Sequence, residues 1–156
     1  MSTKDEQINI VDTLAKHEEA INRLYRTYAD KFPDHQEFWM NLATDESKHS
    51  EWLRKLLDKA KEGTVFIDEK RFKVQAIQTS LDFILRQIAD AENDKIEFKN
   101  ALSVALDIER AMIEKKYFEV FEGDSVELKH VLLALAESTK EHIHRVERAW
   151  TELKQQ

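Results

Sequence analysis

The stretch QEFWMNLATDESKHSEWLRKLL, residues 36–57, carries the pattern on which the fold prediction depends. Its apolar residues recur at the spacing of one face of an α-helix: Phe38, Leu42, Leu53 and Leu56. Glu46 and His49 fall on the same face, three residues apart, where their side chains are neighbours. The stretch therefore predicts a long helix whose buried side carries a carboxylate and an imidazole.

Three further segments show the same helical periodicity. Together the four segments predict long helices over residues 4–32, 35–61, 95–122 and 125–154. Each begins with a short polar residue followed three positions later by Glu, which is the capping-box pattern: Thr3 with Glu6, Asp34 with Glu37, Asp94 with Glu97, and Asp124 with Glu127. Pro33, Gly63 and Gly123 stand where the first three helices should end.

Residues 62–94 form the one long connection, and the segment TSLDFILRQIADA at 79–91 predicts a short extra helix within it. A connection of this length can cross the whole height of a helical bundle. Two glycines and one proline leave little turn chemistry for an all-β or alternating α/β fold. We therefore expect an all-α four-helix bundle, with two helical hairpins joined by one long crossover in a single domain of residues 1–156.

The composition argues against several classes of function. A net charge of −7 is unfavourable for collecting phosphates, and the absence of cysteine excludes disulfides, iron–sulfur clusters and thiolate zinc sites. No stretch approaches the run of about 18 apolar residues that a membrane helix needs. The amino-terminal sequence MSTKDEQINIVD does not have the pattern of a signal peptide. We expect a cytoplasmic protein with neither a nucleic-acid partner nor a membrane partner.

Polar residues on the other predicted apolar faces indicate a metal site. Glu18 lies on the buried face of the first helix, Glu109 on that of the third, and Thr139 and His142 on that of the fourth. All lie near the helix midpoints, so their side chains should meet at one level of the bundle. Buried carboxylates repel one another unless a cation neutralises them. Oxygen and imidazole donors suit iron or manganese, and zinc can compete by affinity.

Two other assignments compete with these residues. His17 touches the edge of the apolar face of the first helix and is an alternative inward residue to Glu18. A second Glu-x-x-His pair, Glu141 and His144, lies on the face opposite the apolar residues of the fourth helix. We expect that second pair to be exposed to solvent.

With these residues in place, the sequence resembles the ferritin-like di-iron carboxylate proteins, and among them the rubrerythrin-like branch. LATDESKH at 42–49 is similar to the second-helix motif of that family, and ALSVALDIE at 101–109 to its third-helix motif. The resemblance implies a ferritin-like bundle that binds two iron ions through these ligands: Glu18, Glu46, His49, Glu109 and His142. It also implies that Tyr25 and Tyr117 lie beside the centre.

The sequence departs from the family pattern in the fourth helix. The family has Glu-x-x-His in its second and fourth helices, but aligning LATDESKH with LAESTKEH at 135–142 puts Thr139 where the fourth-helix Glu is expected. Rubrerythrins proper also carry a four-cysteine rubredoxin-like iron domain, and this chain has no cysteine. We therefore expect one carboxylate ligand fewer than in the family pattern, and any catalytic cycle would need an external electron donor.

Two functions fit this pattern. The first is a di-iron or di-manganese oxidoreductase that reduces peroxide or dioxygen and takes electrons from an external donor. The second is a non-catalytic ferritin-like binding or structural bundle that holds one metal ion or none. The sequence leaves open whether the protein is an enzyme, and a homodimer is the default expectation for its assembly.

Overall fold

A computed structural model of the chain describes residues 4–63, 66–67, 74–114, 121–122 and 126–154. The described residues form five helices: α1 (Lys4–Lys31), α2 (Gln36–Glu62), α3 (Val74–Glu92), α4 (Phe98–Glu114) and α5 (Val126–Lys154). A short 3-10 turn, η1 (Pro33–His35), precedes α2. Two short strands complete the described elements: β1 (Phe66–Ile67) and β2 (Phe121–Glu122).

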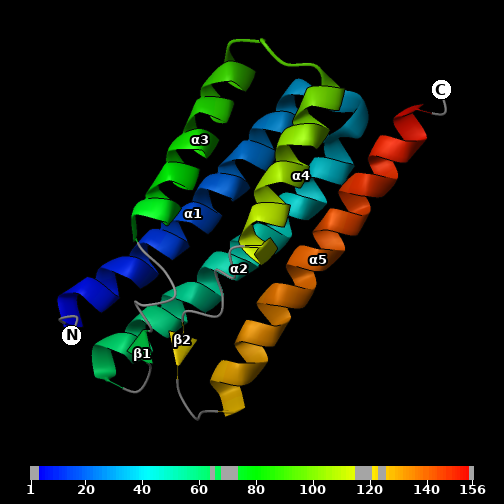
Figure 1. Ribbon diagram of the computed structural model, residues 1–156. Helices are drawn as coiled ribbons and strands as arrows, with labels where there is room; N and C mark the ends of the chain where they lie inside the picture. The colour runs from blue at the N-terminus through cyan, green and yellow to red at the C-terminus, as the bar shows by residue number, and fades with distance from the viewer. Residues whose placement is uncertain (1–3, 64–65, 68–73, 115–120, 123–125, 155–156) are drawn as a thin grey trace.

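The helices form the predicted all-α four-helix bundle of two hairpins (Figure 1). α1 pairs with α2, and α4 pairs with α5. The crossover between the hairpins carries α3, which runs beside α1 over much of the height of the bundle. Because α3 returns the chain to the level where α2 began, α4 runs in the same direction as α2.

The crossover helix is longer than the predicted span of 79–91. It begins at Val74 and ends at Glu92, because the row of buried apolar side chains starts earlier than the sequence pattern suggested. Ile77 is fully buried, and the row continues through Ile84 and Ile88 on the face of α3 that packs against the bundle.

The predicted start of α4 at residue 95 is wrong. Asp94 has a left-handed backbone, with φ of 55°, and therefore belongs to the turn before the helix. The capping interaction is made three residues later, where the backbone N–H of Glu97 donates to the side-chain oxygen of Asn100 at 3.3 Å. The helix consequently begins at Phe98.

The prediction that this helix continues to residue 122 is also wrong. Phe121 and Glu122 form β2, which pairs antiparallel with β1 so that Phe66 faces Glu122 and Ile67 faces Phe121. The start of the crossover and the segment after α4 lie at the same end of the bundle, so their backbone groups can pair with each other (Figure 1). Sequence periodicity contains no signal for so short a ladder.

The other predicted boundaries have mixed outcomes. Gly63 ends α2 in the left-handed conformation, with φ of 83°, as predicted. The predicted cap at Asp34 is not formed, because η1 precedes α2 and no side chain caps the helix at His35. The signals at Thr3, Gly123 and Asp124 lie outside the described residues.

An aromatic cluster fills the core on one side of the polar centre. Trp39 is fully buried, with its ring centroid 5.5 Å from that of Tyr25 and 4.8 Å from that of Tyr28. These large side chains contribute much of the apolar area that holds α1 against α2. Among the described residues, no helix combines the length and hydropathy required to cross a membrane.

Candidate metal centre

All five predicted metal ligands are buried in the interior of the bundle. Each is at most 1% exposed: Glu18, Glu46, His49, Glu109 and His142. They come from α1, α2, α4 and α5, so four helices contribute to one region. Glu109 lies near the end of the described part of α4 rather than at its middle, because the helix bounds differ from those predicted. The five side chains nevertheless converge in two overlapping clusters.

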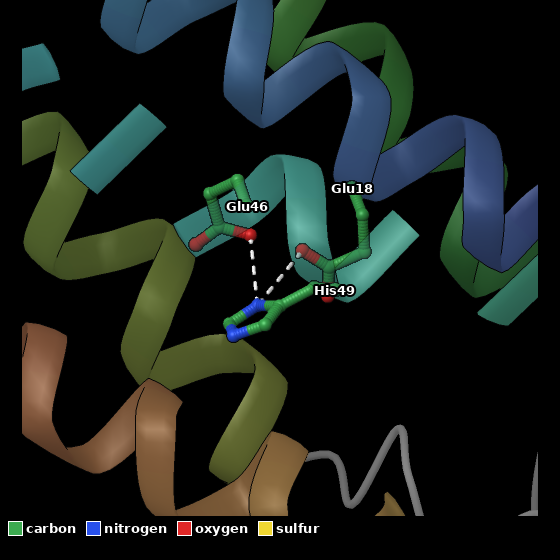
Figure 2. A group of neighbouring side chains, drawn as sticks. All are labelled: Glu18, Glu46 and His49. Atoms are coloured by element: carbon green, nitrogen blue, oxygen red, sulfur yellow. Dashed lines mark hydrogen bonds and ion pairs between the residues drawn. The ribbon is translucent and has the colours of Figure 1, made fainter. Parts of the chain in front are cut away.

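The first cluster consists of Glu18, Glu46 and His49 (Figure 2). His49 Nδ1 lies 3.2 Å from Glu46 Oε2 and 3.7 Å from Glu18 Oε2. One candidate ligand atom from each residue lies within 4.8 Å of those of the other two. The Glu46 and His49 side chains meet because residues three apart share a face of α2.

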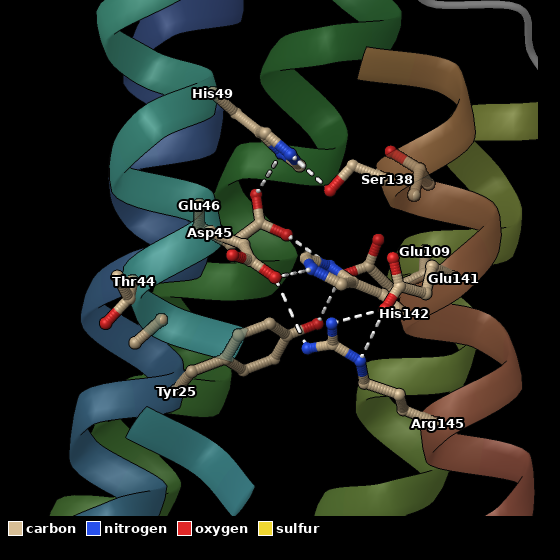
Figure 3. A network of polar contacts seen from close by, with 12 residues as sticks. Tyr25, Thr44, Asp45, Glu46, His49, Glu109, Ser138, Glu141, His142 and Arg145 are labelled. Atoms are coloured by element: carbon tan, nitrogen blue, oxygen red, sulfur yellow. Dashed lines mark hydrogen bonds and ion pairs between the residues drawn. The ribbon is translucent and has the colours of Figure 1, made fainter. Parts of the chain in front are cut away.

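The second cluster consists of Glu46, Glu109 and His142 (Figure 3). His142 Nδ1 lies 3.0 Å from Glu46 Oε1 and 3.1 Å from Glu109 Oε1. Glu46 thus turns one carboxylate oxygen toward each histidine and belongs to both clusters. A carboxylate in that position has the geometry to bridge two metal ions.

Without a metal ion, the centre holds protons. Burial raises the pKa of Glu18 to about 8, and the neighbouring charge of Glu46 adds to this effect. Burial lowers the pKa of His49, but its contacts with the carboxylates of Glu18 and Glu46 outweigh burial and raise the pKa to about 10. In the same way, Glu109 and Glu46 outweigh burial and raise the pKa of His142 to about 11. Positive charge is therefore favourable between these carboxylates, whether protons or cations supply it.

Several carboxylate oxygens in the centre lack the partners that buried polar atoms normally have. Glu18 Oε2, Glu46 Oε1 and Glu109 Oε2 are buried without a hydrogen-bond partner in the described part of the chain. Glu46 Oε1 is close to His142 Nδ1, but this ion pair lacks the angles of a hydrogen bond. Leaving such atoms unpaired is costly, and metal coordination would satisfy them. Three carboxylates and two imidazoles therefore fit two divalent ions.

A second layer of side chains holds His142 and Glu109 in place (Figure 3). His142 Nε2 lies 3.0 Å from Asp45 Oδ2, and a carboxylate can only accept, so Nε2 carries the proton. Arg145 donates to the same Asp45 oxygen at 3.3 Å. The Tyr25 hydroxyl donates to Glu109 Oε1 at 2.8 Å, so the predicted place of Tyr25 beside the centre is confirmed.

The second layer was only partly predictable. His49 Nε2 lies 2.8 Å from the hydroxyl oxygen of Ser138, and neither Ser138 nor Asp45 was singled out from the sequence. Asp45 directly precedes Glu46, and this adjacency was the available signal, because the side chain lies one helical step away from the buried face. Tyr117, the other predicted tyrosine, lies outside the described residues.

The competing assignments are also decided. His17 and Glu18 are both buried, but His17 belongs to neither cluster and its Nε2 lies 2.8 Å from the Ser80 hydroxyl on α3. Glu141 and His144 are exposed, as predicted. Thr139 is fully buried and donates to the Leu135 carbonyl at 2.8 Å, so it supplies a hydroxyl where the family pattern has a carboxylate.

Comparison with protein families agrees with this geometry. The family model for rubrerythrin matches residues 9–122 of the chain. The chain belongs to the rubrerythrin family. The resemblance predicted from the sequence is thereby confirmed, and with it the ferritin-like fold. No curated protein sequence and no solved structure matches the chain.

The range matched by the rubrerythrin model includes most, but not all, of the candidate ligands. It includes Glu18, Glu46, His49 and Glu109, which lie on α1, α2 and α4. It ends before α5, the helix that carries His142 and Thr139. The matched range therefore contains four of the five candidate ligands, whereas His142 lies outside it and is placed in the centre by its contacts alone.

A cavity brings solvent close to the centre. It has a volume of about 370 Å³ and is lined by Phe38, Asn41, Thr44, Asp45 and Arg145. Asp45 lines this cavity and contacts His142 with Oδ2. Asp45 therefore connects the lining of this cavity to the second cluster.

Proposed function

We propose that the protein is a di-iron oxidoreductase that reduces peroxide or dioxygen, with metal ligands Glu18, Glu46, His49, Glu109 and His142. The observation that carries this proposal is the pair of buried clusters that share Glu46. Membership of the rubrerythrin family, a ferritin-like di-iron family, supports iron as the metal. Manganese has the same ligand preferences and is the alternative ion, and zinc can compete by affinity.

Two iron(II) ions held by these residues would supply the two electrons that, with two protons, convert hydrogen peroxide to two water molecules or dioxygen to hydrogen peroxide. An external donor returns these electrons. The chain itself contains no cysteine from which a thiolate electron-transfer centre could be built.

The residues of the chain bind and orient the ions. The carboxylates neutralise most of the charge of two divalent ions, and Glu46 ties the two positions together. Asp45 fixes the proton of His142 on Nε2, so the Nδ1 lone pair is free for a metal once its own proton leaves. Tyr25 holds Glu109 through Oε1.

The surrounding core keeps bulk water from the ligands. All five side chains are at most 1% exposed, so reactive oxygen chemistry takes place away from solvent. The cavity bordered by Asp45 lies next to the second cluster, because Asp45 contacts His142. A small oxidant such as peroxide fits that volume.

Anaerobic iron loading followed by rapid mixing with peroxide tests the proposal. We expect two iron(II) ions per chain and rapid growth of the near-ultraviolet absorption of iron(III) after mixing. Glu18→Ala should lower the iron content and slow this oxidation, because the first cluster loses a ligand. Unchanged iron content and rate in that variant would contradict the ligand assignment.

A non-catalytic binding bundle is the second candidate function, and Thr139 is the observation that favours it. The Thr139 hydroxyl is bonded to a backbone carbonyl of its own helix, so α5 contributes one ligand where the family pattern has two. A fraction of one ion per chain after iron loading, together with no oxidation by peroxide, would support this second function. Two ions and rapid oxidation would exclude it.

A further inference from the structure

The two histidines of the centre have outer partners of different chemistry. His142 Nε2 donates to the Asp45 carboxylate at 3.0 Å, whereas His49 Nε2 contacts the neutral Ser138 hydroxyl at 2.8 Å. A carboxylate behind a metal-bound histidine fixes its tautomer and makes its other nitrogen a stronger donor, and a hydroxyl does so less. His142 is therefore the better prepared metal ligand.

The Asp45 carboxylate is itself held in position. Arg145 donates to Asp45 Oδ2 at 3.3 Å and also forms an ion pair with Glu141 on its own helix. A row of alternating charges thus runs from the surface of α5 through Asp45 to His142 (Figure 3). This row limits the positions that the His142 ring can adopt.

Glu18 and Glu109, the two carboxylates that each belong to a single cluster, also differ in how they are held, and again the second cluster is the better prepared. Glu109 has one oxygen anchored by the Tyr25 hydroxyl at 2.8 Å, and this donor lies outside both clusters. Each carboxylate also has one buried oxygen without a hydrogen-bond partner in the described part of the chain, Glu18 Oε2 and Glu109 Oε2, so the bond from Tyr25 is what distinguishes Glu109. Binding an ion to the second cluster therefore requires less ordering of its side chains than binding to the first.

We propose that the two halves of the centre bind metal with unequal affinity: the ion held by Glu46, Glu109 and His142 binds first and more tightly, and the ion at Glu18 and His49 binds second. Asp45 acts as the positioning residue that creates most of this difference. The inference rests on the proposed metal-binding function and goes beyond it, because it assigns an order of loading and names the residue that sets it. The metal ion at Glu18 and His49 is accordingly the one that exchanges more readily.

Titration of the metal-free full-length chain with Mn(II) tests the order, with free Mn(II) measured by electron paramagnetic resonance. We expect two classes of site whose dissociation constants differ at least tenfold. Crystals grown with one equivalent of Mn(II) should show one anomalous peak, between Glu46, Glu109 and His142. Occupancy of the second cluster alone at one equivalent, with the first cluster filling only at higher Mn(II), would agree with the inference.

Substitutions in the outer layer identify the cause of the difference. Asp45→Asn should weaken the tight class about 10- to 100-fold and leave the weak class unchanged. Asp45→Glu restores a carboxylate and should recover part of the loss, which a general packing defect would not show. Ser138→Ala should affect the weak class alone. Asp107→Asn makes the same charge change at an exposed position on α4 and serves as the matched control.

Several results would overturn the inference. They are equal affinities, a first ion at Glu18 and His49, or an Asp45→Asn variant that binds both ions as the unchanged chain does. Two equal, well-occupied sites would reject the order of loading but leave the proposed function intact. No Mn(II) binding in a folded chain would reject both.

Discussion

Glu46 is the residue on which both halves of the centre depend, and Glu46→Gln is therefore the most informative substitution. The amide keeps the shape of the side chain but removes its negative charge and replaces one oxygen with a nitrogen that does not bind metal. Glu46 Oε2 lies 3.2 Å from His49 Nδ1, and Oε1 lies 3.0 Å from His142 Nδ1. The change therefore reaches both clusters.

The expected loss follows from the ligands that remain. In Glu46→Gln, the carboxylate and imidazole ligands that remain are Glu18 with His49 in one cluster and Glu109 with His142 in the other, and the one amide oxygen is a neutral, weak ligand that can face only one of them. Protein metal sites usually need three ligands or more, so neither position should hold an ion. We expect the iron content to fall from two ions per chain to well below one. In contrast, Glu18→Gln and Glu109→Gln each leave one cluster of three intact and should each retain one ion.

The assay is metal analysis after anaerobic iron(II) loading and desalting, with circular dichroism to verify that each variant is folded. Glu51→Gln, at an exposed position on the same helix, is the matched control and should bind as much iron as the unchanged chain. If Glu46→Gln retains two ions, or if Glu18→Gln and Glu109→Gln each lose both, Glu46 is not the shared ligand.

Four other predictions test the fold and the electrostatics. Folding raises three pKa values in the centre: to about 8 for Glu18, about 10 for His49 and about 11 for His142. The folded metal-free chain therefore binds more protons than the unfolded chain. The contribution of these groups to the stability of the folded chain is complete at low pH and is lost as pH rises through these values. The urea concentration at the unfolding midpoint of the metal-free chain should therefore decrease between pH 6.5 and 10. An increase would contradict the assignment. Arg54 is partly exposed, and its Nη1 lies 2.6 Å from Asp12 Oδ1 across the hairpin. Arg54→Ala should therefore reduce the unfolding free energy by about 0.2–1 kcal/mol, and by less in high salt. A loss of several kcal/mol would be inconsistent with a surface ion pair. Ile77→Ala, in the part of α3 that sequence analysis missed, should reduce it by about 2–5 kcal/mol in the same urea assay, and a negligible effect would mean that this turn is not packed in the core. Thr139→Glu should add a ligand on α5 and tighten Mn(II) binding in a calorimetric titration, whereas weaker binding would show that the position has no room for one.

The proposed difference between the two halves has a consequence for the chemistry. An ion in the exchangeable half, at Glu18 and His49, can be lost during purification or replaced by zinc. Metal content measured without reloading would then underestimate the capacity of the centre. Activity assays therefore require protein that has been reloaded with iron(II) under anaerobic conditions.

Helix periodicity predicted which residues face the core better than where the helices begin and end. Glu18, Glu46, Glu109 and His142 were all placed on buried faces from spacing alone, and all are buried. The face of a helix on which a residue lies depends only on local backbone geometry, which repeats about every 3.6 residues. Boundaries depend on which backbone groups find partners elsewhere, as the pairing of residues 121–122 with 66–67 demonstrates.

The amino-acid sequence by itself determined the four long amphipathic helices, the buried acids and imidazoles, and the family to which the chain belongs, because side-chain order along a helix sets its apolar face. Only the tertiary structure decided that Glu46 serves both clusters and that His142 has Asp45 behind it while His49 has Ser138. These pairings join residues far apart in the chain. They depend on the relative rotation and height of packed helices, which the packing of side chains between helices sets and which no single helix contains.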